Sequence, residues 1–135
     1  MIYYLSALFL VAMLTKCASP KVLPSNCSGD ILDVGLAVKG LSPCSFCTIK
    51  KELLKDGFSI VLSDTTYTIK EFRIEYYHLY RLESQKEIFG NKVDKKNVDF
   101  LSKLEPGDEL SIECIYIEKD KKIFLSTGMM IGIIR

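Results

Sequence analysis

Apolar side chains alternate with polar or small ones along much of the chain from residue 57 onward. Phe58, Ile60 and Leu62 stand two residues apart, and the segment 72–76 repeats this spacing. Successive side chains of an extended strand point to opposite faces, so a period of two predicts strands with one buried face. The sequence therefore predicts a mainly β fold.

A long strand is predicted from Tyr67 to about Leu79. Tyr67 and Ile69 share one face, but the next apolar residues continue in the opposite phase, with the slip between Lys70 and Glu71. One extra residue there is what a β-bulge inserts, and it bends a strand while both halves keep facing the core. The polar residues between the apolar ones are expected on the solvated side: Arg73 and Glu75.

Other strands are predicted at 31–38, 58–62, 82–89, 110–116 and 123–134, with turns at 64–65, 90–91, 105–108 and 119–122. In the strand at 110–116 the alternation places one set of side chains on a common face: Leu110, Ile112, Cys114 and Tyr116. Gly128 and Gly132 are expected as bulge or close-approach positions. Segment 44–55 fits either a helix or an extended chain.

A short helix is predicted over Lys95–Leu104, because Asp94 can cap it and apolar residues recur there every three positions. Several short strands, one short helix and no β–α alternation favour an immunoglobulin-like antiparallel β-sandwich. A chain of 135 residues is long enough for one such domain with a core of its own. We expect this domain to span residues 31–135.

The N-terminal segment has the character of an export signal. Residues 2–15 form an apolar or small-residue stretch that is shorter than the roughly 20 residues needed to cross a bilayer as a helix. Its length suits the apolar region of a signal peptide, although no Lys or Arg precedes it. We therefore expect residues 1–17 to be a signal peptide and 18–30, with Pro20, Pro24 and Gly29, to be a flexible tether.

Two processing routes are open at Cys17. The sequence Leu14-Thr15-Lys16-Cys17 resembles a bacterial lipobox, whose cysteine receives the lipid, but Lys16 stands where that motif has a small residue. Ordinary signal peptidase could instead cut after Cys17. The protein is then expected in the periplasm or, with a lipid on Cys17, anchored at the outer membrane.

Four further cysteines are expected as structural disulfides or buried thiols of an oxidising compartment: Cys27, Cys44, Cys47 and Cys114. Four cysteines allow three pairings, and the sequence does not choose among them. As an alternative, Cys44 and Cys47 could form a redox-active pair at the start of a helix capped by Ser42, which would make the chain a small thiol–disulfide protein. No second paired spacing supports a zinc site, and neither a metal nor a cofactor is indicated.

An aromatic cluster at 76–80 is the candidate interface. Alternation puts Tyr76, His78 and Tyr80 on one face, and tyrosine-rich patches are common at protein–protein interfaces. His78 is the one histidine of the sequence, and no serine, cysteine or carboxylate stands beside it by spacing, so no catalytic residue is predicted. Lys plus Arg number 18 against 17 for Asp plus Glu, and this balance gives no reason to expect nucleic acid as a partner.

The segment 57–135 resembles the C-terminal domain of the GldM/PorM family, periplasmic components of the gliding-motility and type IX secretion machinery of Bacteroidetes. The resemblance lies in the strand Tyr67–Phe72, in the segment Phe100–Asp108 with its Leu-x-Pro-Gly-Asp turn, and in the strand Glu109–Ile115. It implies an immunoglobulin-like sandwich that works by protein–protein contact. We expect the chain to be a freestanding copy of this domain, without the transmembrane helix and upstream domains of that family.

These features predict a non-enzymatic interaction module of the periplasm or membrane surface, linked to a gliding or type IX-like system. Its expected partner is an envelope protein, and a lipid on Cys17 would also attach the chain to the membrane. No small-molecule substrate is indicated. The thiol–disulfide protein described above is the alternative function.

Overall fold

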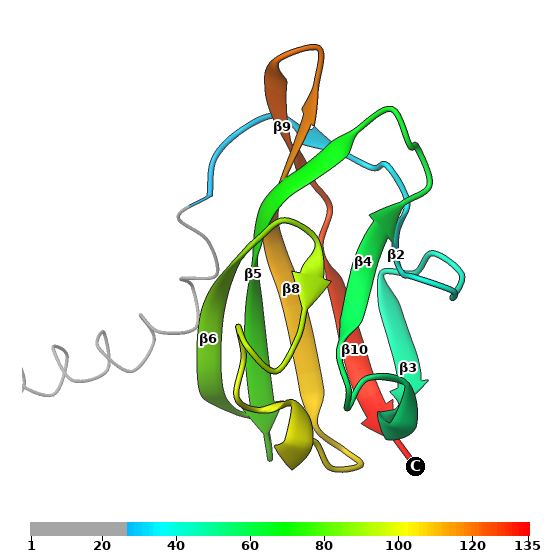
Figure 1. Ribbon diagram of the computed structural model, residues 1–135, viewed down its shortest axis with the longest axis vertical. Coiled ribbons are helices and arrows are strands. Elements are labelled where there is room, and N and C mark those ends of the chain that lie inside the picture. The colour runs from blue at the N-terminus through cyan, green and yellow to red at the C-terminus, as the bar shows by residue number, and fades with distance from the viewer. Residues whose placement is uncertain (1–26) are drawn as a thin grey trace, which may run out of the picture.

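The computed structural model describes residues 27–135, and the predicted signal at 1–17 and most of the tether lie outside them. Strands dominate the described chain (Figure 1). They are β1 Ile31–Leu32, β2 Leu36–Val38, β3 Phe46–Lys50, β4 Phe58–Leu62, β5 Thr68–His78, β6 Arg81–Phe89, β7 Lys92–Val93, β8 Glu109–Lys119, β9 Lys122–Ser126 and β10 Met129–Ile134. Two short 3-10 helices complete them, η2 Lys51–Leu53 and η3 Leu101–Lys103.

The strands form two layers. In the larger sheet β5 pairs with β6 and β8, while the other edge of β8 pairs with β10 in its first half and β9 in its second. The smaller sheet has the order β2-β4-β7 and lies in front of β8 and β10 in Figure 1. The predicted mainly β sandwich is confirmed, although β1–β9 and β3–β10 are parallel pairs and the larger sheet is therefore mixed.

The long ladder between β5 and β8 holds most of the larger sheet together. Its register shifts between Ile69 and Glu71, which confirms the bulge expected beside Lys70. Arg73 pairs with Glu113 and Tyr76 with Leu110 further along. Because the bulge restores the phase, both halves of β5 direct apolar side chains toward the smaller sheet.

The expected alternation in β8 is wrong beyond Ile112. Ile115 and Ile117 are fully buried there, whereas Cys114 and Tyr116 are only partly buried. The cause is Cys114, whose φ of 49° places one extra residue in β8 opposite β5. This second bulge turns the Cys114 side chain away from the core and lets three isoleucines of β8 remain inside.

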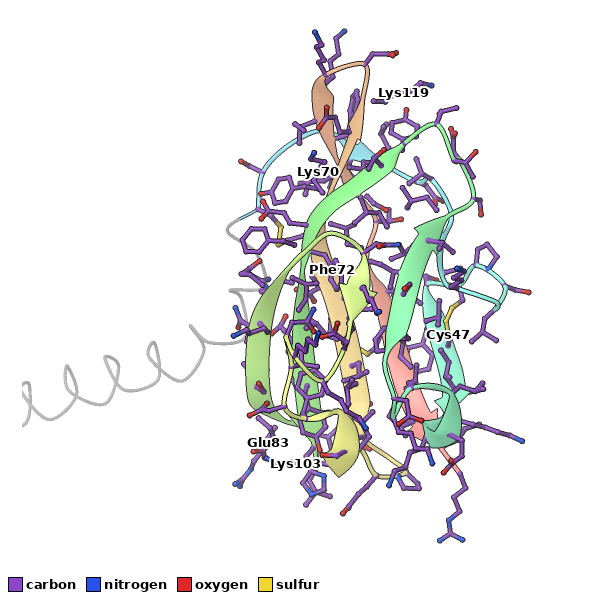
Figure 2. The ribbon with its side chains drawn as sticks, viewed as in Figure 1. Cys47, Lys70, Phe72, Glu83, Lys103 and Lys119 are labelled. Carbon is purple, nitrogen blue, oxygen red and sulfur yellow. A yellow bond between two sulfur atoms is a disulfide. The ribbon has the colours of Figure 1, made fainter. Side chains whose placement is uncertain are left out.

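One apolar core fills the space between the sheets. Phe72 points into it from β5 (Figure 2), and neighbouring strands and loops add fully buried side chains. The largest of them are Phe72, Phe100, Leu54, Ile60, Ile74, Ile88, Leu101, Leu104, Leu110, Ile112, Ile115 and Ile117. The predicted strands at 58–62 and 82–89 match β4 and β6.

Predicted segments elsewhere in the chain also differ from the structure. The strand at 31–38 divides into β1 and β2, which belong to different sheets, because the chain turns at Gly35 with a φ of 68°. The helix expected at 95–104 is reduced to turns and η3: Asp94 caps only the first turn, accepting from the backbone N–H of Lys96 and Asn97 at 2.9 and 3.1 Å. The last four residues of the expected tether belong to the domain, since Asp30 accepts a hydrogen bond from Leu125.

The predicted last strand at 123–134 is interrupted by Gly128, which separates β9 from β10. A Cβ atom on Gly128 would lie 2.6 Å from the backbone oxygen of Ile112, whereas a Cβ on Gly132 would meet nothing closer than 3.8 Å. Gly128 is thus the close-approach position that the sequence suggested, and Gly132 is not.

We expect Gly128→Ala to lower the free energy of unfolding by roughly 1–3 kcal/mol, because β8 and β10 must separate to admit the methyl group. Gly132→Ala is the matched control and should be neutral or slightly stabilising, since alanine loses less conformational entropy in a strand. Urea denaturation of both variants measures the difference. Equal stabilities would show that the close approach at Gly128 does not constrain the fold.

Candidate functional site

The four described cysteines form two disulfide bonds, Cys27–Cys114 and Cys44–Cys47, with Cα–Cα distances of 5.5 and 5.9 Å. The first joins residues 87 positions apart and ties the start of the domain to the middle of β8. The second closes a short loop that leads into β3, with Cys47 as a residue of that strand. The outward turn of the bulged Cys114 is what makes the first bond possible, because the core face of β8 is filled by isoleucines.

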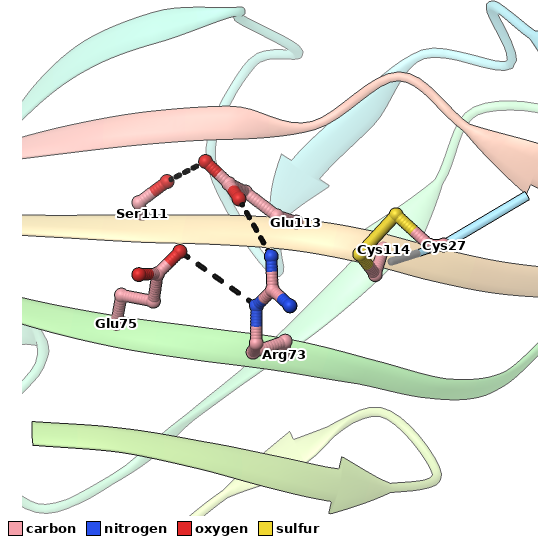
Figure 3. The surroundings of a disulfide bond; sticks show 6 residues. All are labelled: Cys27, Arg73, Glu75, Ser111, Glu113 and Cys114. Carbon is pink, nitrogen blue, oxygen red and sulfur yellow. Dashed lines mark hydrogen bonds and ion pairs between the residues drawn. A yellow bond between two sulfur atoms is a disulfide. The ribbon is translucent and has the colours of Figure 1, made fainter. Parts of the chain in front are cut away.

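An ionic cluster lies beside Cys114 on the sheet face that points away from the smaller sheet (Figure 3). The Arg73 guanidinium lies 3.1 Å from a Glu113 carboxylate oxygen and 3.7 Å from one of Glu75. Ser111 donates to Glu113 at 2.8 Å, and the Tyr77 hydroxyl donates to Glu75 at 3.1 Å. These residues join β5 to β8 across the ladder.

Arg73 and Glu75 were expected on a solvated face, yet the side chain of Arg73 is 12% exposed and that of Glu75 is 9%. Burial raises the pKa of Glu75, and the neighbouring Glu113 carboxylate raises it further. Burial, together with the charge of Glu75, also raises the pKa of Tyr77 to about 12. Paired charges can be buried in this way when each has partners, and the cluster links β5 to β8 where Arg73 pairs with Glu113.

The Cys44–Cys47 disulfide lies partly exposed at the start of β3. Phe46 beside it is 63% exposed, while Ile49 is buried in the core. The backbone from Phe46 to Lys50 is extended, so the helix that the redox alternative placed here is absent from this stretch. Without a helix N-terminus, one of the physical causes of a low cysteine pKa is missing.

At the C-terminal end of β5, the His78 ring forms a hydrogen bond with Asp108. The His78 Nδ1 lies 2.7 Å from Asp108 Oδ1, and the Tyr76 hydroxyl donates to Asp108 Oδ2 at 2.8 Å. The backbone N–H of Glu105 donates to the same Oδ2, also at 2.8 Å. Asp108 is 2% exposed and lies in the turn before β8, so it joins that turn to the end of β5. The hydrogen bond to Asp108 raises the pKa of His78, and the charges of Asp108 and Glu105 act in the same direction.

The predicted interface residues separate into three environments. Tyr76 is 6% exposed and stacks on Phe100 with ring centroids 5.1 Å apart, so it is a core residue and the interface prediction for its side chain is wrong. The His78 side chain is 35% exposed. Tyr80 is 89% exposed. Alternation failed because β5 ends at His78, and Tyr80 lies in the turn that follows.

Leu79 and Tyr80 form the whole turn between β5 and β6, since His78 pairs directly with Arg81. Their φ angles of 49° and 62° are those of a type I′ hairpin turn, which favours asparagine, aspartate and glycine. Left-handed backbone costs an ordinary residue roughly 1–2 kcal/mol. Leu79 is 75% exposed, and Leu82 just beyond is 49% exposed, so three large apolar side chains are gathered at this end.

Comparison of the sequence with models of known protein families and with curated proteins found no match. Among residues 27–135 no group of three or more His, Cys, Asp or Glu side chains could hold a metal ion. No helix in this part of the chain is long and apolar enough to cross a membrane.

The two disulfides should differ in their contribution to stability. Replacing Cys27 and Cys114 by serine should lower the free energy of unfolding by about 4–5 kcal/mol, and replacing Cys44 and Cys47 by about 2 kcal/mol, because a cross-link that closes a longer loop restricts the unfolded chain more. Chemical denaturation of the two double variants measures both effects. A larger loss on removing Cys44–Cys47 would contradict this assignment.

Stability should also depend on His78. Its pKa in the folded protein lies above the unfolded value of about 6.5, so its contribution is complete below that pH and is lost as the pH rises through the folded pKa. Thermal unfolding from pH 5.5 upward should show this loss in the wild type and not in His78→Gln. The same decline in both proteins would assign it to other groups.

Proposed function

We propose that this chain is a non-enzymatic protein–protein interaction module that works outside the cytoplasm at the cell envelope. The observation that carries the proposal is the end of the β5–β6 hairpin, where Leu79, Tyr80 and Leu82 are exposed together on a cross-linked β scaffold. Large exposed apolar side chains gathered at one place are typical of binding surfaces. Tyrosine is also enriched at such interfaces.

The disulfides support the location. Cystine pairs form and persist in oxidising compartments, and both cysteine pairs of residues 27–135 are joined. This agrees with the export signal expected at 1–17, whose processing at Cys17 decides whether the module is free or lipid-anchored.

The resemblance of segment 57–135 to the C-terminal domain of GldM and PorM suggests where to look for the partner. We propose an envelope protein of a gliding or type IX-like system as the first candidate. The resemblance that suggests this candidate lies in the sequence order of Tyr67–Phe72, the Leu-x-Pro-Gly-Asp turn and Glu109–Ile115.

Crosslinking in intact cells tests the interaction. The chain, expressed in its own host and treated with a lysine-reactive crosslinker, should yield a discrete larger species that contains one envelope protein. Lys86, Lys103 and Lys121 are exposed for the reagent on different parts of the surface. Recovery of background proteins alone, at every crosslinker concentration, would contradict the proposal.

The thiol–disulfide function remains the second candidate because Cys44–Cys47 is a disulfide within reach of solvent. It requires a Cys44 thiol pKa well below the ordinary value of about 8.5 and disulfide exchange that disappears in Cys44→Ser. We expect an ordinary pKa and no such activity. Titration of the reduced protein with iodoacetamide at different pH values distinguishes the two candidates.

A further inference from the structure

The larger sheet has two hairpins of the same design at opposite ends of the molecule (Figure 1). In the β5–β6 hairpin His78 pairs with Arg81 around Leu79 and Tyr80, and in the β8–β9 hairpin Lys119 pairs with Lys122 around Asp120 and Lys121. The central φ angles are 49° and 62° in the first turn and 52° and 63° in the second. Both turns therefore require two consecutive residues with left-handed backbone.

The residues of the two turns differ in how well they suit this backbone conformation. Asp120 belongs to the residues that tolerate left-handed backbone, and Asp120 and Lys121 are both polar and exposed. Leu79 and Tyr80 are poor choices for the same geometry, and at 75% and 89% exposure they make few contacts that could offset the strain. Large apolar residues that neither suit the turn nor pack in the fold point to a role outside the folding of the chain.

Hydrogen bonds hold the end of β5 in place directly before the Leu79–Tyr80 turn. His78 is hydrogen-bonded to the buried Asp108, which also accepts hydrogen bonds from the Tyr76 hydroxyl and the Glu105 backbone N–H. These hydrogen bonds attach the end of the β5–β6 hairpin to the turn before β8. The backbone at the base of the turn is thus held in place, which lowers the entropy lost when a partner covers the two side chains.

Charges of both signs surround the turn. Arg81 and Glu83 follow it on β6, and Lys103 and Glu105 are exposed on the neighbouring loop. Glu83 and Lys103 lie at this same end of the molecule, far from Lys119 (Figure 2). An anionic lipid surface attracts basic clusters, and the balanced set here does not provide one. An apolar centre with a mixed polar rim is the arrangement found at protein interfaces.

We infer that Leu79 and Tyr80 are the anchor residues of the interface, and that they insert into an apolar pocket of a folded protein whose rim carries charges of both signs. This inference rests on the proposed function and names its binding site. Two side chains alone bury less area than a stable complex needs, so the surrounding charged residues form the rim of the contact.

The first part of the test is stability. The double variant Leu79→Asn/Tyr80→Gly gives the β5–β6 turn its preferred residues, and we expect its Tm to rise by about 5 °C or more. Asp120→Asn/Lys121→Gly is the matched control at the other turn and should raise the Tm by less. A lower Tm for the Leu79/Tyr80 variant would mean that these side chains serve the fold, and would overturn the inference.

The second part is binding. Tyr80→p-benzoylphenylalanine in the full chain, illuminated in the host cells, should crosslink one protein, and Lys121→p-benzoylphenylalanine should not. That protein, once identified and purified, should bind the wild type and the Asp120/Lys121 control equally and the Leu79→Asn/Tyr80→Gly variant at least tenfold more weakly. Equal binding of all three would overturn the inference while leaving the proposed function intact.

Binding to lipid is tested by sedimentation of the full chain, processed as in the cell, with phosphatidylethanolamine–phosphatidylglycerol vesicles. For a form without lipid on Cys17, we expect no difference in vesicle binding between the wild type and the Leu79→Asn/Tyr80→Gly variant. Vesicle binding that is lost in this variant would identify a lipid surface as the occupant and overturn the inference.

Discussion

The fold depends on the antiparallel ladder between β5 and β8, the two longest strands of the described chain. Each strand contains an extra residue, beside Lys70 in β5 and at Cys114 in β8, and together the two bulges keep the core faces aligned along the whole ladder. The smaller sheet packs on that face. Without the second bulge, Ile115 and Ile117 would turn outward and the core would lose two fully buried side chains.

The same ladder positions the features that matter for function. The outward turn at Cys114 brings its sulfur to Cys27, which fixes the first described residue against the middle of β8. The ends of the two strands bring His78 to Asp108, and this contact supports the exposed Leu79–Tyr80 turn. The position of Cys27 and the proposed binding end are therefore set by one pair of strands, at separate places on the larger sheet.

Sequence patterns predicted the strands where one face is apolar and the other is not, as in β4 and in the bulged β5. They failed at Cys114, because Ile115 and Tyr116 are both apolar and the alternation fits either phase. The Leu79–Tyr80 turn carries no glycine, asparagine or proline, so the turn rules give no signal there. The His78–Asp108 contact joins residues 30 positions apart and follows only from the strand pairing, which the sequence alone does not determine.

An extra residue at Cys114 of β8 turns that side chain to the outer face, where it is joined to Cys27. Peptide mapping by mass spectrometry, on protein isolated from its host without reduction and with free thiols blocked, tests this link most directly. We expect one peptide pair linked through Cys27 and Cys114, and an internal bond between Cys44 and Cys47. Free thiols at all four positions, or a bond from Cys44 or Cys47 to Cys114, would contradict it.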